Sequence, residues 1–60
     1  MGNRALKRRI ESLRQRVIEH EVKIASELKL SQPDHGLIKH WQIEIDAFTI
    51  SIGRALKRLG

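Results

Sequence analysis

The sequence predicts an all-α protein, an antiparallel two-helix hairpin with coiled-coil-like packing. Two stretches with helical apolar spacing occupy nearly the whole chain, and a single cluster of turn-forming residues separates them. A connection this short places two helices side by side and antiparallel. We therefore expect one hairpin over residues 1–60, with helices at about 3–30 and 36–59 and a turn at about 31–35.

The first helix is indicated by apolar residues that alternate steps of four and three, the spacing of helices that pack at coiled-coil angles. These positions are Leu6, Ile10, Leu13, Val17, Ile24 and Leu28. The pattern is interrupted around His20. A lone histidine on such a seam is most often a hydrogen-bonded core residue or a polar group that sets the helix register, and we expect that role. A pH-sensitive interface is the alternative, because histidine titrates near neutrality.

The turn is the segment Ser31-Gln32-Pro33-Asp34-His35-Gly36. Pro33 cannot continue the first helix but suits the first turn of the second, so Ser31 or Gln32 is expected to cap that helix. Asp34 would then lie in the first turn, where a negative charge interacts favourably with the helix dipole.

The second helix is indicated by an unbroken seam of the same spacing. Its positions are Ile38, Trp41, Ile45, Phe48, Ile52, Ala55 and Leu59. Residues 43–52 are rich in β-branched side chains and partly alternate, which would also suit a strand. We favour a helix, because the seam continues through this segment and intrinsic propensity is weaker than pattern. Trp41 is expected to anchor the core near the turn.

A second set of apolar residues lies opposite the two seams, at about 100° per residue. The set consists of Ile18, Val22 and Ala25 in the first helix and Ile43, Ala47 and Ile50 in the second. Exposed apolar groups of this kind usually mark contacts. We therefore expect self-association, most simply a dimer that forms a four-helix bundle. The alternative is a larger helical assembly that uses both faces.

The charge is concentrated at the chain ends. The net charge is +5, but residues 1–16 and 53–60 together carry +8, and the middle of the chain carries −3. The sequence Arg-Ala-Leu-Lys-Arg occurs at residues 4–8 and again at 54–58, and a hairpin brings both copies to one end. The basic residues expected there are Arg4, Lys7, Arg8, Arg9, Arg54, Lys57 and Arg58.

Basic residues at a helix N-terminus interact unfavourably with its dipole, and two basic clusters repel each other. Such a cost suggests an acidic partner, most plausibly the phosphate backbone of DNA or RNA with weak sequence preference. No aromatic residue lies among the basic residues, so base stacking is not expected. The alternative is a purely structural or protein-interaction module whose charges only keep it in solution.

Composition excludes several other classes. A chain of 60 residues is marginal as an isolated domain, and the lack of cysteine removes disulfides and thiolate metal sites. A reducing compartment is compatible with this composition, so we expect a cytoplasmic location. No apolar run exceeds two residues, so a membrane span is not expected.

No catalytic or metal site is expected either. His35 and His40 are five residues apart, whereas helical zinc pairs use a spacing of four. The acidic residues resemble solvated helix surface and inter-helix pairing partners for Lys23 and Lys29, and no nucleophile–base set or glycine-rich phosphate loop occurs. We therefore expect no enzymatic activity, no cofactor and no small-molecule substrate.

The layout resembles that of small homodimeric helical-hairpin proteins of the Rop type, whose best-known member binds RNA. The resemblance is one of length and arrangement only. No residue motif is shared, so no functional residue is implied. The shared layout adds modestly to the expectation of nucleic-acid binding.

Overall fold

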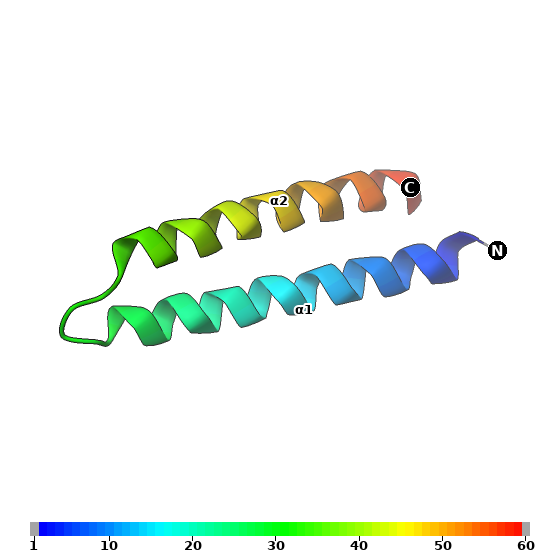
Figure 1. The fold of residues 1–60 in the computed structure, drawn as a ribbon. Coiled ribbons are helices and arrows are strands. Elements are labelled where there is room, and N and C mark those ends of the chain that lie inside the picture. Colours follow the sequence, from blue (N-terminus) through cyan, green and yellow to red (C-terminus); the bar gives the residue numbers. More distant parts are fainter. Residues whose placement is uncertain (1, 60) are drawn as a thin grey trace.

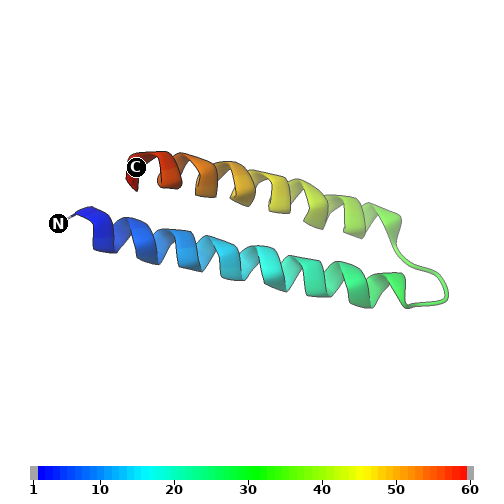
Figure 2. The ribbon, with the colours of Figure 1, turned by 180° about the vertical axis from the view of Figure 1, so that it is seen from behind.

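The computed structural model describes residues 2–59, and within them the chain forms two α-helices. Helix α1 spans Gly2–Leu28 and helix α2 spans His35–Leu59. The helices lie side by side and antiparallel, so the start of α1 and the end of α2 are at the same end of the molecule (Figures 1 and 2). The molecule is elongated, measuring 49 × 14 × 12 Å. The predicted all-α hairpin is thus confirmed. Met1 and Gly60, which belong to the predicted hairpin, lie outside the described residues.

Residues 43–52, which also suited a strand, are helical throughout. The seam explains this, because Ile45 and Phe48 turn toward α1 only if the helical period is kept. The hydroxyl of Thr49 donates a hydrogen bond of 2.8 Å to the Ile45 carbonyl, so this β-branched residue is accommodated within α2.

The core is a narrow seam between the helices. Its buried side chains are Ile10, Ile45 and Ala55, which are 5–8% exposed. The other predicted seam residues, including Trp41 near the turn, are half-buried, with one exception. Two packed helices cannot enclose a side chain on all sides, so none of the described residues is fully buried.

The exception is Leu28, which was predicted on the seam but is 55% exposed. Helix α1 ends at this residue, about two residues earlier than expected, and the backbone N–H groups of Lys29 and Leu30 close the last turn with bonds to the carbonyls of Ser26 and Glu27. Glu27 is half-buried, because its carboxylate accepts the N–H of Asp34 at 3.1 Å. The tightened helix end and this bond direct Glu27, rather than Leu28, toward the connection.

The second helix is capped by Asp34, so the prediction of Ser31 or Gln32 as the cap was wrong. The Asp34 carboxylate accepts the Leu37 N–H at 3.0 Å, the geometry of an N-cap side chain. Asp34 therefore lies one residue before α2, and Pro33 lies before it, outside the helix. An aspartate reaches the free N–H groups of the first turn better than glutamine, which explains the choice. A Cβ at Gly36 would lie 3.3 Å from the capping oxygen.

Neither of the two described helices is long and apolar enough to cross a membrane.

Candidate functional site

The hairpin brings part of the predicted basic cluster together at its open end. Because α1 begins there and α2 ends there, residues near 6–9 lie beside residues near 51–58 (Figure 1). A hollow of about 440 Å³ lies between the helices at this end. It is lined by Leu6, Arg9, Ser51, Arg54, Ala55 and Arg58. We call this hollow the arginine groove.

The arginine groove combines an apolar floor with a cationic rim. Ala55 is buried and Leu6 is half-buried, whereas the three arginines are exposed. Both ion pairs found within residues 2–59 are made by histidines, so no arginine there is paired with a carboxylate. The half-buried Ser51 is the one neutral polar residue among those that line the groove.

The other predicted basic residues lie elsewhere on the same end. Arg4, Lys7 and Arg8 line a second hollow made by α1 alone, together with Glu11, Ser12 and Gln15. Lys57 is exposed in the last turn of α2. The structure therefore divides the predicted tip into an inter-helix set, Arg9, Arg54 and Arg58, and an outer set, Arg4, Lys7 and Arg8.

The helix dipoles act differently on the basic residues of α1 and on those of α2. The first turn of α1 contains no acidic residue, so the positive end of its dipole faces Arg4 uncompensated. The last turn of α2 contains Lys57 and Arg58, where cations interact favourably with the dipole. Because the helices are antiparallel, their dipoles oppose each other at the open end, and the positive potential there comes from the basic side chains of both helices.

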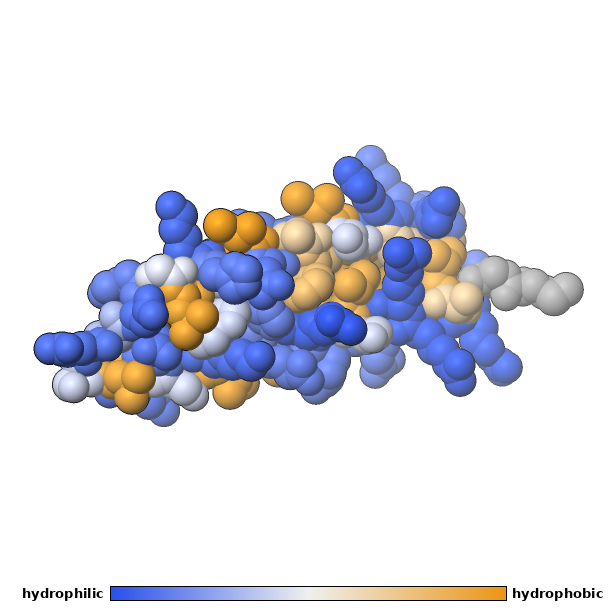
Figure 3. Space-filling view, in the orientation of Figure 1, coloured by the Kyte–Doolittle hydropathy of each residue, from blue (hydrophilic) through white to orange (hydrophobic). Residues whose placement is uncertain are grey.

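The predicted second apolar set is exposed. Ile18, Val22, Ile43 and Ile50 are 51–59% exposed, and Ala25 and Ala47 are exposed as well. In Figure 3 apolar atoms reach the surface along the α2 edge at the top and along the α1 edge at the bottom.

A different apolar surface joins the two helices on the side away from the arginine groove. It is a hollow lined by Lys7, Ile10, Glu11, Arg14, Gln15, Ile18, Leu56 and Leu59. Of the predicted apolar set, Ile18 belongs to it. Leu56 is 43% exposed and was not predicted as an interface residue. The seam spacing of α2 could have indicated it, because Leu56 follows the seam residue Ala55.

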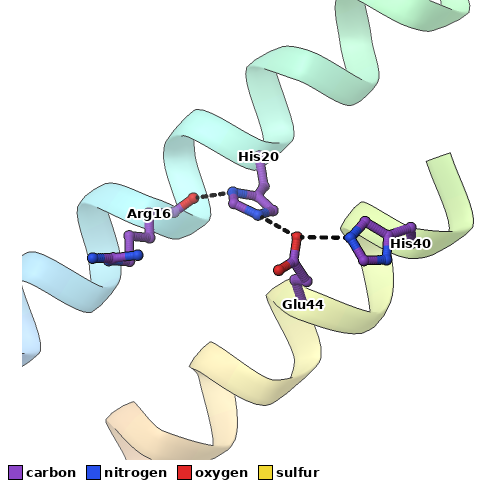
Figure 4. Close-up of polar contacts among 4 residues, drawn as sticks. All are labelled: Arg16, His20, His40 and Glu44. Atoms are coloured by element: carbon purple, nitrogen blue, oxygen red, sulfur yellow. Dashed lines mark hydrogen bonds and ion pairs between the residues drawn. The ribbon is translucent and has the colours of Figure 1, made fainter. Parts of the chain in front are cut away.

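A polar cluster occupies the middle of the seam, where His20 meets α2 (Figure 4). The Nε2 atom of His20 lies 2.9 Å from Oε1 of Glu44, and its Nδ1 atom lies 2.9 Å from the carbonyl oxygen of Arg16. Its ring also packs edge-on against Phe48, with centroids 5.3 Å apart. The prediction that His20 is a hydrogen-bonded seam residue is confirmed.

Each ring nitrogen of His20 lies within hydrogen-bond distance of an oxygen acceptor, one on its own helix and one on α2. His40 adds a longer contact, with Nε2 3.4 Å from the same Glu44 oxygen. The hydrogen bond from His20 lowers the pKa of Glu44, although burial alone would raise it. The charges of His40 and Lys23 also lower this pKa.

Glu44 was expected at the solvated helix surface and as an inter-helix pairing partner for Lys23 or Lys29, and its hydrogen-bond partner on the other helix is instead His20. The Glu44 side chain is 41% exposed and is held between two histidines. Sequence spacing offered one signal, since His40 and Glu44 stand four residues apart on α2. The bond to His20 depends on the register of the two helices. Among residues 2–59, no three acidic, histidine or cysteine side chains are grouped as metal ligands.

Comparison of the chain with protein-family models, curated proteins and solved structures finds no match. The class is therefore defined by the fold alone: the protein is a helical hairpin with a basic open end.

Proposed function

We propose that the protein is a small, non-enzymatic, self-associating helical hairpin whose basic open end binds an acidic partner, most plausibly the phosphate backbone of DNA or RNA. One observation carries the proposal. Arginines from both helices line one hollow at this end, and none of them is paired with a carboxylate within residues 2–59. The repulsion among these unpaired arginines is offset when a polyanion binds and its counterions are released.

The test is the salt dependence of binding to a short DNA duplex and a short RNA duplex. The dissociation constant is measured by fluorescence anisotropy at several salt concentrations. We expect affinity to fall steeply with salt. The slope of the logarithm of the binding constant against the logarithm of the salt concentration should become shallower by roughly one for each phosphate contact removed. A variant with Arg4, Arg8, Arg9, Arg54 and Arg58 changed to alanine should show a much flatter slope. A wild-type protein that binds neither duplex at low salt would contradict the proposal.

Self-association is supported by the small core. Only three side chains are buried among residues 2–59, whereas eight large apolar side chains are exposed. A standard interface buries about 800 Å² on each partner, roughly a sixth of the 5015 Å² that one hairpin exposes. A second copy of the chain can therefore supply the burial that a single hairpin lacks.

We propose that the second copy packs on the apolar side of the hairpin, opposite the arginine groove, to form a four-helix bundle. That side includes Ile10, Ile18, Leu56 and Leu59. The arginine groove would repel the same groove of a second copy, whereas the apolar side carries charges of both signs, Glu11 and Arg14. The outer residues Ile43 and Ile50 lie beyond this interface, and their burial would require the larger assembly.

Native mass by light scattering tests this arrangement. Leu56→Glu should convert the dimer to a monomer, whereas Ile50→Glu should leave the dimer intact and serves as the matched control on the same helix. A mass that changes only with Ile50→Glu would place the interface on the outer side of α2. A folded monomeric wild type would contradict self-association.

The second candidate is a purely structural or protein-interaction module. The exposed apolar side chains favour it, because they need a partner irrespective of the charges. Self-association without binding to either duplex at low salt would support this candidate. For either function we propose a cytoplasmic location, with which the cysteine-free composition is compatible.

A further inference from the structure

We propose that the arginine groove is a phosphate-binding site, and that a phosphate group bound there joins the two helices at the open end of the hairpin. The inference rests on the proposed function and deepens it, because it assigns the phosphate contacts to one place. It names Arg9 of α1 and Arg54 and Arg58 of α2 as the residues that hold the phosphate.

The first argument is the composition of the groove. Three arginines and one serine line a single hollow of about 440 Å³. A guanidinium group offers several N–H donors in a planar fork that matches two oxygens of a phosphate group. Donors that converge from both sides of a groove can bind more than one phosphate oxygen at once. The hydroxyl of Ser51 can donate to another oxygen.

The second argument is a comparison with the two other hollows at this end. Each of those includes the carboxylate of Glu11, which weakens the attraction of an anion. The lining of the arginine groove contains arginines but no acidic residue. Its three like charges repel one another across the helix pair. A bound dianion would offset that repulsion by its attraction to all three.

The third argument is that the groove belongs to both helices. Arg9 is contributed by α1, and Arg54 and Arg58 are contributed by α2, so the site exists only in the closed hairpin. A ligand that binds only the folded state raises its stability by mass action. The outer set, Arg4, Lys7 and Arg8, lies on α1 alone and cannot couple binding to hairpin closure in this way.

The chain offers a matched pair of variants for the test. R9Q/R54Q/R58Q removes the groove set, and R4Q/K7Q/R8Q removes the outer set, so each lowers the formal net charge from +5 to +2. If the groove holds phosphate, the groove variant should bind the duplex about tenfold more weakly than the outer variant. Equal losses would overturn the proposal, because they would mean that only the overall charge matters.

A charge-preserving variant separates geometry from charge. R9K/R54K/R58K keeps the net charge but replaces each planar fork with a point charge. We expect it to bind the duplex severalfold more weakly than the wild type, and R4K/R8K to bind like the wild type. Circular dichroism should show that all four variants keep the helical content of the wild type.

Thermal unfolding with inorganic pyrophosphate tests the site without any nucleic acid. At constant ionic strength, pyrophosphate should raise the unfolding temperature of the wild type and of R4Q/K7Q/R8Q above its value in chloride, and should leave R9Q/R54Q/R58Q unchanged. The same rise in all three proteins, or no rise in any, would overturn the groove as a phosphate site. If this rise occurs but the wild type binds no duplex, the groove stands as a site for small phosphates and the nucleic-acid function is wrong.

Discussion

Polar side chains lie along the helix interface both in the middle of the hairpin and at its open end. Those in the middle are paired with each other, whereas those at the open end all carry positive charge. In the middle, His20 has an acceptor for each ring nitrogen, and Glu44 has two histidines around one oxygen. At the open end, Arg9, Arg54 and Arg58 line one groove with no acidic residue in its lining. The middle is therefore suited to holding the two helices in register, and the open end to holding an anion.

This difference shows which polar groups of a small fold are available for binding. Groups that are paired within the chain contribute to its stability, and a ligand could reach them only by breaking those bonds. Groups of one sign that share a groove raise the energy of the unbound protein and lower that of the complex. The contrast makes four predictions, from the largest expected effect to the smallest.

The largest effect is expected from the core beside the polar cluster. Ile45→Ala should lower the free energy of unfolding by about 2–5 kcal/mol, because Ile45 is buried against α1 and the seam cannot refill the space. Urea unfolding followed by circular dichroism measures the loss. Ile50→Ala, on the exposed side of the same helix, is the control and should change stability by less than about 0.5 kcal/mol. Equal losses would show that the seam is not the main source of stability.

The next effect is expected from His20. His20→Ala removes the bond to the Arg16 carbonyl and the packing on Phe48, and should lower the free energy of unfolding by about 1–2 kcal/mol. A double-mutant cycle with Glu44→Gln should show positive coupling between the two residues. If the two losses of unfolding free energy are strictly additive, the bond between His20 and Glu44 does not contribute to stability.

Acid should lower the stability of the hairpin through Glu44. Because the pKa of Glu44 is lowered in the folded state, its contribution is complete above the ordinary pKa of a glutamate, about 4.3, and is lost as pH falls through the lower value. The charged groups around it are His20 on α1, His40 on α2 and Lys23 on α1. Thermal unfolding from pH 7 to pH 3 should show this loss, and Glu44→Gln should reduce it. An unchanged acid profile in that variant would contradict the assignment.

The smallest effect concerns repulsion at the open end. In the absence of any polyanion, Arg9→Gln should raise the free energy of unfolding by about 0.2–1 kcal/mol at low salt, and added salt should remove the gain. Arg8→Gln, outside the groove, is the control and should give a smaller gain. A loss of stability in Arg9→Gln would show that its methylene groups pack in the groove more than its charge repels.

The seam and the helix ends illustrate how far sequence patterns reach. The spacing from Leu6 to Ile24 and from Ile38 to Leu59 predicted both helices, because amphipathic periodicity is a local property of the chain. It failed at the connection, where Leu28 is exposed and Asp34 is the cap. Those details depend on which side chain reaches a free N–H group, and several residues in the turn could have done so.

The candidate site was predicted in its composition but not in its grouping. The two copies of Arg-Ala-Leu-Lys-Arg indicated a basic end, and the hairpin places both there. The division into the groove set and the outer set depends on how each helix is rotated about its axis. The same rotation brings Ser51 into the groove and Leu56 to the apolar side, and neither residue was predicted.

The sequence by itself determined that the chain forms two helices, that one turn joins them, and that positive charge collects where they begin and end. These properties follow from spacing and composition along the chain. Only the tertiary structure decided that Arg9 lines the same groove as Arg54 and Arg58, and that His20 forms a hydrogen bond with Glu44. The physical reason is that residues 24 or more positions apart come into contact only when two helices pack in one register, which the seam as a whole selects.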